Sequence, residues 1–461
     1  MRRFLPPTRS LPCALVCTAA LLIVTACSSS DDSGTTAPSG GYAVGDEPFA
    51  VKAATSILAQ GGSAADAATA MFFTLSVTYP VAAGLGGGGI CVVHDQATGR
   101  NEVFNFLARD TASQGAFAIP GNVAGFAALQ AAYGNMPWQR DVSPAEQYAA
   151  TGFPISSALS DRLGSAQDVV RLDAGLAREF LNESGAVRPA GQIATNTDLA
   201  STLAAIRVGG ADAFYRGNIA AKISGYTSTQ NGAISIAELA NYQVHREMPR
   251  VVALGGELGY LPPEQIGAGA FAGTLLSRLV DSEGNIVTGD HVATATASAT
   301  KAALDQFGIS ELPRDLGATG FAVVDNSGQA VSCAVTLDGP FGSGHTVPGT
   351  GITLARSPSS GQTGIAAAFL TPALATDGQG GSVMLAGAGA GGPNGTAAIA
   401  YALLRLARGV DMTQPDSVRS TGIAPYDTVN VITCQGGICA TLPDPQAHGL
   451  GAAAGNVTGA Q

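Results

Sequence analysis

This chain of 461 residues contains 61 glycines, and 23 basic and 34 acidic side chains give it a formal net charge of −11. Only 12% of its residues are charged, against about 25% in an average globular protein, so its surface is weakly charged. Hydrophobic residues make up 46% of the chain, which is too much for a disordered protein. So few basic side chains cannot cover phosphate backbones, and we therefore expect no nucleic acid partner.

The first residues predict an export signal. Met1-Arg2-Arg3 is a short basic start, an apolar run from residue 11 to 24 follows, and Val24-Thr-Ala-Cys27 ends it. This pattern is typical of a secretory signal, and its end resembles that of a bacterial lipoprotein, in which Cys27 is lipidated. We expect a signal peptide at 1–26 and a disordered tether at 27–41, with an ordinary signal peptide and an incidental cysteine as the alternative.

The predicted protein is therefore exported and reaches a membrane only through its lipid anchor, on the periplasmic side or the cell surface. No later stretch reaches the roughly 18 uninterrupted apolar residues that a membrane-spanning helix needs.

After the tether, apolar residues recur at helical spacing from residue 48 to 78. Gly61-Gly62 divides this stretch into two helices, and Ser63 is a suitable cap for the second. A glycine-rich turn at 84–89 leads into strands at 90–94 and 103–107, and helical patterns dominate from 123 to 304. A β-hairpin is predicted at 321–325 and 330–337, with further strands at 351–354 and 383–386, and a helix at 396–408 follows the glycine run 387–392. This order predicts a layered α+β fold.

The cysteines of the mature chain fall into two pairs of different character. Cys434 and Cys439 flank a Gly-Gly turn between two short strands, so in an oxidising compartment we expect a disulfide across that hairpin. Cys91 and Cys333 lie in apolar strand patterns, and we expect them to be two buried small hydrophobic residues. No cysteine or histidine pair has the spacing of metal ligands, so no metal is expected.

A series of motifs follows in order along almost all of the mature chain. They are Leu58-Ala-Gln-Gly-Gly-Ser-Ala-Ala-Asp-Ala-Ala68, Val77-Thr-Tyr-Pro80, Gly84-Leu-Gly-Gly-Gly-Gly89, Arg109-Asp110, Pro120-Gly-Asn-Val-Ala-Gly125, Tyr133-Gly-Asn-Met-Pro137, Ala213-Phe-Tyr-Arg-Gly217, Leu261-Pro-Pro263, Thr336-Leu337, Phe341-Gly-Ser-Gly344, Gly391-Gly392 and Asp444-Pro445. Each motif alone is weak, because glycine-rich turns are common. Their collinear order closely resembles the γ-glutamyltransferase family of N-terminal-nucleophile hydrolases.

The resemblance implies a four-layer αββα sandwich that is made as a precursor and cuts itself in front of a threonine. Residues 42–317 then correspond to the large subunit and 318–461 to the small subunit of one domain. The new terminal threonine attacks a γ-glutamyl amide, such as that of glutathione, with its own α-amine as general base, and no cofactor is implied. Gly391 and Gly392 match the turn whose N–H groups stabilise the oxyanion, and Arg109 matches the arginine that binds the substrate's α-carboxylate.

This sequence departs from the family's pattern at the nucleophile. In strict register with Val323-Val324-Asp325, the nucleophile position is Ala318, Thr319 takes the second position, and Gly320 replaces a histidine. Thr319 is the candidate catalytic residue only if the strand start slips by one residue. Such a slip turns its side chain to the opposite face of the strand unless a bulge corrects it.

Other substrate contacts of the family are replaced as well. Asp338 stands where the family has an asparagine, the acidic run that binds the substrate's α-amine is replaced by 355–360, and a serine pair corresponds to Ala368-Phe369. Two hypotheses remain: an acyl-amide hydrolase or transferase that uses Thr319, with Arg109 and Asp338 at the substrate, or a non-catalytic relative that acts as a binding or structural lipoprotein.

Overall fold

The computed structural model describes residues 40–281, 283–289, 291–359, 361–379, 381–410, 412 and 426–455. The predicted signal peptide, Cys27 and all but the last two residues of the predicted tether lie outside the described residues. Among the residues that are described, no helix is long and apolar enough to cross a membrane.

Seven antiparallel strands form the first of two large sheets. Their order is β19 (Leu450–Ala453), β1 (Tyr42–Gly45), β11 (Ala318–Val324), β12 (Gln329–Thr336), β2 (Gly88–Asp95), β3 (Arg100–Phe106) and β8 (His245–Glu247). The predicted hairpin at 321–337 is confirmed as β11 and β12, with Phe321 opposite Cys333. The first described strand, β1, pairs with β11, with Gly45 opposite Phe321, so residue 46 comes close to the candidate nucleophile positions.

Six antiparallel strands form the second sheet. Their order is β18 (Ile438–Leu442), β17 (Thr428–Gln435), β16 (Val383–Ala390), β15 (Thr371–Asp377), β10 (Glu257–Leu261) and β9 (Arg250–Leu254). Strands β8, β9 and β10 lie in the stretch where the sequence pattern favours helices. These strands are short, and their pairing partners β3 and β15 are far away in the sequence, so local periodicity gives no sign of them.

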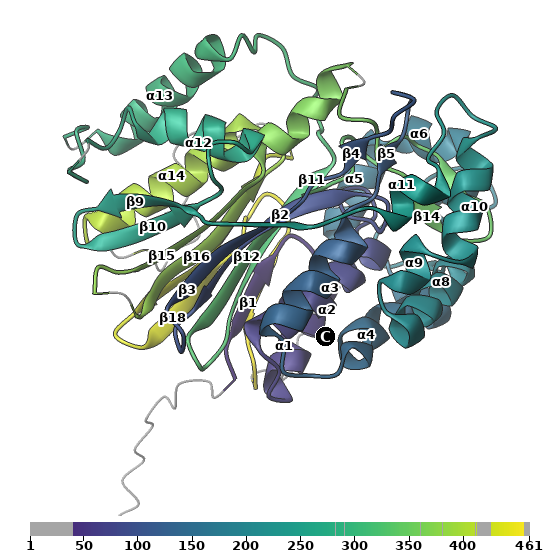
Figure 1. Cartoon of the computed structure of the whole chain (residues 1–461), viewed down its shortest axis with the longest axis horizontal. Coiled ribbons are helices and arrows are strands. Elements are labelled where there is room, and N and C mark those ends of the chain that lie inside the picture. Colours follow the sequence, from purple (N-terminus) through teal and green to yellow (C-terminus); the bar gives the residue numbers. More distant parts are fainter. Residues whose placement is uncertain are drawn as a thin grey trace, which may run out of the picture. The chain divides into compact units, whose positions relative to one another are not determined.

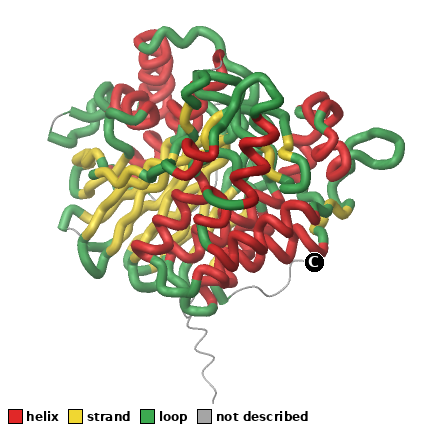
Figure 2. The backbone as a smooth tube through the Cα atoms, turned by 45° about the vertical axis from the view of Figure 1, so that its right-hand side comes forward, coloured by secondary structure: helices red, strands yellow, loops and turns green. Residues whose placement is uncertain are grey.

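Helices cover the outer face of each sheet, which confirms the four-layer αββα fold (Figures 1 and 2). On the seven-stranded sheet lie α1 (Pro48–Ala59), α2 (Ala64–Thr78) and α3 (Asn122–Tyr133). On the six-stranded sheet lie α12 (Gly267–Leu276) and α14 (Pro393–Ala407), with α13 (Val292–Gln306) packed on α14. A third apolar cluster fills the space between the two sheets.

The break between α1 and α2 is built as the sequence predicts. The hydroxyl of Ser63 accepts a hydrogen bond from the N–H of Asp66, and the Asp66 carboxylate accepts one from the N–H of Ser63, which makes a capping box.

Shorter elements complete the domain. Eight helices lie between α3 and β8, and small β-pairs and a 3-10 helix connect the layers: α4 (Trp138–Thr151), α5 (Ser157–Ser165), α6 (Gln167–Leu172), α7 (Ala174–Phe180), α8 (Thr197–Gly209), α9 (Asp212–Tyr215), α10 (Asn218–Thr227), α11 (Ile236–Ala240), β4 (Arg109–Asp110), β5 (Ala118–Ile119), β6 (Phe153–Pro154), β7 (Ile193–Ala194), β13 (Thr346–Val347), β14 (Ile352–Thr353) and η1 (Gly361–Phe369).

Both cysteine pairs of the described chain are disulfides. Cys434 and Cys439 are joined across the β17–β18 hairpin, where the sequence predicts a bridge. Cys91 and Cys333 are buried, as expected, but the interpretation of them as small hydrophobic residues missed that they too form a disulfide. They lie directly opposite each other on β2 and β12, and a register between strands 242 residues apart cannot be seen in the sequence pattern.

Candidate functional site

The start of strand β11 presents residues 318 and 319 to opposite faces of the seven-stranded sheet, because side chains alternate along a strand. Ala318 and Ala322 belong to the apolar cluster between the two sheets. Phe321 and Val323 belong to the cluster beneath the first helical layer. Thr319 is two residues before Phe321 on the same strand, so its side chain lies on the same face of the sheet. The methyl group of Ala318, the predicted nucleophile position, therefore faces the space between the two sheets, and the hydroxyl of Thr319 lies on the other side.

The Thr319 hydroxyl is buried and bound to a carboxylate. It donates a 2.6 Å hydrogen bond to Asp46 Oδ2, and Asn430 Nδ2 donates one of 2.7 Å to Asp46 Oδ1. Burial raises the pKa of Asp46 to about 6, although these two hydrogen bonds work in the opposite direction. Asn430 also donates to the carbonyl oxygen of Gly320, so it links β17 of one sheet to β11 of the other.

Position 320, where the family's pattern has histidine, has no room for a side chain. A Cβ atom on Gly320 would lie 2.8 Å from Cβ of Ala388 on the facing strand β16. The two sheets approach each other closely here, which requires glycine at this position.

The chain that enters β11 is held by hydrogen bonds on both sides of the bond between Gly317 and Ala318. The carbonyl oxygen of Gly317 accepts hydrogen bonds from Thr336 Oγ1 at 2.9 Å and from the N–H of Leu337 at 3.0 Å. Gly317 has a positive φ of 61°, and a Cβ atom on it would overlap the carbonyl oxygen of Gly339. This conformation is therefore open to glycine alone.

A buried ion pair fixes the same segment from the helical side. Arg162 on α5 pairs with Asp315, and the two side chains are only 2% and 8% exposed. Arg162 Nη1 also donates a 3.1 Å hydrogen bond to the carbonyl oxygen of Ala318. Asp315 in turn accepts from the N–H of Gly317 at 2.8 Å. One arginine thus holds both ends of the 315–318 segment.

The glycine turn at 391–392 joins β16 to α14. Gly391 has a φ of 87°, and a Cβ atom on it would overlap the carbonyl oxygen of Tyr426. Asp427 accepts a 3.1 Å hydrogen bond from the N–H of Asn394, at the start of α14. Among the described residues, neither glycine N–H has a hydrogen-bond partner, so both amides are available to an oxyanion or another acceptor.

A cavity of about 320 Å³ adjoins this turn, and its other wall is the segment that precedes β11. It is lined by Leu304, Ile309, Ser310, Leu312, Pro313, Arg314, Leu316, Gly391, Gly392, Pro393, Asn394 and Asp427.

The two residues predicted to bind the substrate, Arg109 and Asp338, do not contact each other. Arg109 lies on β4, and Asp338 follows the end of β12. Arg109 Nη2 donates a 2.8 Å hydrogen bond to the carbonyl oxygen of Gln243, and its guanidinium lies 4.8 Å above the ring of Tyr242. Asp338 is buried with a φ of 57°, and burial together with the charge of Asp110 raises its pKa to about 7. Its Oδ1 atom has no hydrogen-bond partner among the described residues.

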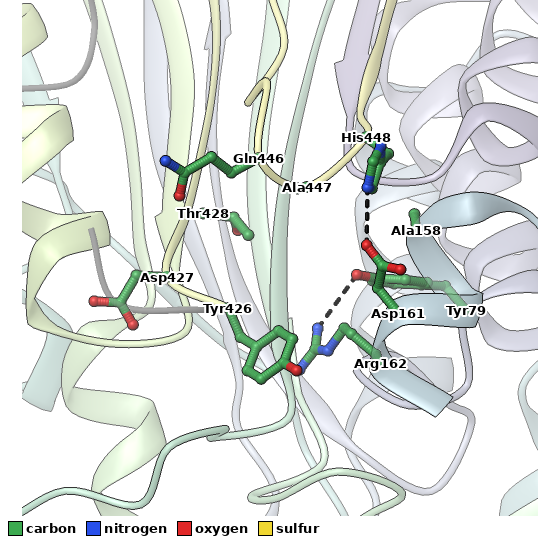
Figure 3. A pocket seen from close by; sticks show the side chains of 10 residues that line it. All are labelled: Tyr79, Ala158, Asp161, Arg162, Tyr426, Asp427, Thr428, Gln446, Ala447 and His448. Atoms are coloured by element: carbon green, nitrogen blue, oxygen red, sulfur yellow. Dashed lines mark hydrogen bonds and ion pairs between the residues drawn. The ribbon is translucent and has the colours of Figure 1, made fainter. Parts of the chain in front are cut away.

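A second cavity, of about 400 Å³, is lined by Arg162, which holds the segment before β11 (Figure 3). Arg162 and Tyr79 form one wall and are joined by a hydrogen bond, and Tyr426 lies beside Arg162. The ring of Tyr426 lies 5.3 Å from the Arg162 guanidinium and 5.8 Å from that of Arg314. Tyr426 thus packs against one arginine from each cavity, since Arg162 lines the larger and Arg314 the smaller.

Three residues of this site were missed by sequence reasoning: Asp46, Arg162 and Tyr426. The only sequence signal for Asp46 is an acidic pair directly after an apolar strand and before Pro48. Arg162 has no signal, because burial of one arginine on a polar helix depends on its partner 153 residues away. Among the described residues, no cluster of histidine, cysteine and acidic side chains is arranged to hold a metal ion.

Comparisons with known proteins place this site in context. The family model described as Gamma-glutamyltranspeptidase matches residues 50–307 and 285–361. The chain is 29% identical over 416 residues to a glutathione hydrolase proenzyme of Pseudomonas aeruginosa, which covers 76% of this chain and 74% of that protein. It is 31% identical over 235 residues to glutathione hydrolase 2 of Arabidopsis thaliana, covering 47% of this chain and 40% of the relative.

The chain therefore spans well under two thirds of the length of the Arabidopsis relative. Among solved structures, a cephalosporin acylase from Bacillus halodurans superimposes with a TM-score of 0.71 at 18% identity, over 90% of this chain and 96% of that one. That likeness shows the shared fold.

Proposed function

The chain belongs to the gamma-glutamyltranspeptidase family, and we propose that it is an exported member that stays one uncut chain and binds γ-glutamyl or related acyl-amide compounds without hydrolysing them. The single observation that carries this proposal is the side chain at residue 318. An alanine there offers no hydroxyl or thiol to attack an amide carbonyl.

The surroundings of Thr319 support the same conclusion. Its hydroxyl is on the opposite face from Ala318 and is already bound to the buried carboxylate of Asp46. It lines neither of the cavities beside the start of β11. A nucleophile must reach its substrate, and this hydroxyl reaches no described cavity near the site.

The residues at the predicted cleavage position support an intact chain. Self-cleavage requires the side chain after the cleaved bond to attack the carbonyl carbon before it. The methyl group of Ala318 cannot attack the carbonyl carbon of Gly317.

The glycine turn supports the binding part of the proposal. Gly391 and Gly392, whose N–H groups have no hydrogen-bond partner among the described residues, line a cavity of about 320 Å³, which is within the size range of small-molecule sites. A carbonyl or carboxylate oxygen of a bound acyl amide would accept hydrogen bonds from these two N–H groups. Export and lipid attachment at Cys27 are part of the proposal. If the lipid holds the protein, Cys27→Ala is lost from isolated membranes, whereas the native chain stays with them.

One observation favours a second candidate function, an amidase that is cut before Thr319. The carboxylate of Asp46 lies 2.6 Å from the Thr319 hydroxyl, and its pKa of about 6 is suited to a general base. In that case the Thr319 α-amine and hydroxyl become accessible only after residues 315–318 move away.

The experiment that separates the two candidates is an intact-mass measurement on the purified mature protein, together with an assay on a γ-glutamyl anilide. We expect one chain, no release of the anilide product, and binding of glutathione that is measurable by calorimetry. A glutathione hydrolase serves as the positive control for the assay. Two chains, one of them starting at Thr319, with turnover that Thr319→Ala abolishes and Thr319→Ser retains, would overturn the proposal in favour of the amidase.

A further inference from the structure

A separate cavity of about 660 Å³ lies among α6, α7, α10 and the loops around β13, at the helical side of the domain. Its size is in the range of small-molecule sites, and none of its lining residues lines the two cavities beside the start of β11.

The two acidic residues of this cavity already have partners. Asp198 forms an ion pair with Arg178 at 2.9 Å. Asp173 accepts hydrogen bonds from the N–H groups of Leu176 and Thr346, each at 2.9 Å. Their negative charges are thus compensated within the protein.

Arg356, in contrast, brings a positive charge that no carboxylate of the described residues neutralises. Its Nε atom donates a 2.7 Å hydrogen bond to the carbonyl oxygen of Gly342. In the described part of the chain, its guanidinium has no carboxylate partner, and the two terminal nitrogens make no hydrogen bond. Arg356 is half-buried and lines the cavity, so it is a candidate to bind an anion there.

Two further polar groups on the cavity wall are uncommitted. His345 Nδ1 lies 2.9 Å from the carbonyl oxygen of Ser343, which can only accept, so Nδ1 carries a hydrogen and Nε2 of the neutral ring can only accept a hydrogen bond, as from an N–H of a ligand. The hydroxyl of Tyr226 has no hydrogen-bond partner among the described residues, and burial with the nearby charge of Asp173 raises its pKa, so it remains a donor. Val169, Val347 and Pro348 supply apolar surface beside these groups.

We propose that this cavity binds a small organic carboxylate with an apolar body, such as an N-acyl amino acid, with the carboxylate on Arg356. A planar guanidinium with two free terminal nitrogens matches the two oxygens of a carboxylate, and Tyr226 adds a third donor. The apolar side chains accommodate the acyl or side-chain part of the ligand. This goes beyond the function proposed above, because the cavity shares no lining residue with the cavity at the glycine turn or with the one beside Arg162.

The test is isothermal titration of the purified mature chain with N-acetyl-leucine and with N-acetyl-leucinamide, which differ only in the carboxylate. We expect the acid to bind at least about 10-fold more tightly than the amide, because hydrogen bonds to charged groups contribute more than neutral ones. Arg356→Gln should remove this preference, and Arg356→Lys should retain part of it.

Arg178→Gln is the matched control, since it removes a cation of the same cavity that Asp198 already neutralises. We expect it to weaken binding of the acid less than about 3-fold. A melting curve verifies that each variant is folded, and Tyr226→Phe, which removes one hydroxyl only, provides a second test by weakening acid binding. Equal binding of acid and amide by the native chain, or equal losses in Arg356→Gln and Arg178→Gln, would overturn the proposal.

Discussion

Arg162 and Asp315 form a buried ion pair that joins helix α5 to the segment directly before strand β11. Removing one partner of such a pair leaves a charge without compensation in the interior, which typically costs about 3–5 kcal/mol. We therefore expect Arg162→Met to lower the free energy of unfolding by at least about 3 kcal/mol, as measured by urea denaturation.

The matched control for this prediction is Arg178→Met, whose pair with Asp198 is 71% and 35% exposed. Exposed ion pairs contribute about 0–1 kcal/mol, so this variant should be almost as stable as the native chain. Similar losses in the two variants would contradict a special role of the Arg162–Asp315 pair.

Gly317 offers a second test of the same segment. Alanine there has an unfavourable positive φ and a Cβ atom that overlaps the carbonyl oxygen of Gly339. Gly308 has a similar φ of 67° but open space around it, so Gly308→Ala isolates the conformational cost of about 1–2 kcal/mol. We expect Gly317→Ala to be destabilised by at least about 2 kcal/mol more than Gly308→Ala in denaturant melts, and equal effects would show that the overlap relaxes at little cost.

The fold could be predicted from the sequence because its evidence is local and collinear. The capping box at Ser63 and the hairpin at 321–337 depend on residues close in the chain, and both are present. The motif order then supplied the layer architecture. Strands β9 and β10 were not predicted, because they are short and pair with distant strands.

The candidate site was only partly predictable, for a related reason. Strand alternation alone places Thr319 opposite Ala318, so this relationship follows from the sequence. The carboxylate of Asp46, the ion pair of Arg162 and the disulfide between Cys91 and Cys333 all join residues more than 150 positions apart. No periodicity or local spacing contains information about such pairs.

The two disulfides should differ in their effect on stability. In the chain-entropy model, a cross-link stabilises by restricting the unfolded chain, and the effect grows with loop length. Cys91 and Cys333 are 242 residues apart and Cys434 and Cys439 only 5, which corresponds to roughly 5 and 2 kcal/mol.

Paired alanine variants measure these contributions. We expect the Cys91→Ala, Cys333→Ala variant to lose clearly more unfolding free energy than the Cys434→Ala, Cys439→Ala variant in denaturant. Reductant should have no further effect on a variant that lacks both bridges. A larger loss from the short hairpin bridge would mean that native-state strain or structure in the unfolded chain outweighs loop length.

The buried carboxyl of Asp141 gives the chain a predictable pH dependence. Burial and the neighbouring carboxylate of Asp66 raise the pKa of Asp141 from 3.8 to about 9. Asp66 itself is fixed by hydrogen bonds from the N–H groups of Ser63, Asn135 and Met136. Between pH 4 and 9 the unfolded chain has released this proton and the folded chain retains it, so this group lowers stability as pH rises.

We therefore expect Asp141→Asn to be more stable than the native chain at pH 8, by at least about 2 kcal/mol, and nearly equal to it at pH 4. Asparagine keeps the size and a hydrogen donor toward Asp66 but cannot ionise, so the fall in stability with pH should become shallower. Urea unfolding at several pH values measures this slope, and the control Asp168→Asn, whose side chain is 87% exposed, should leave it unchanged. A slope that is the same in Asp141→Asn and in the native chain would mean that Asp141 ionises as readily when folded as when unfolded.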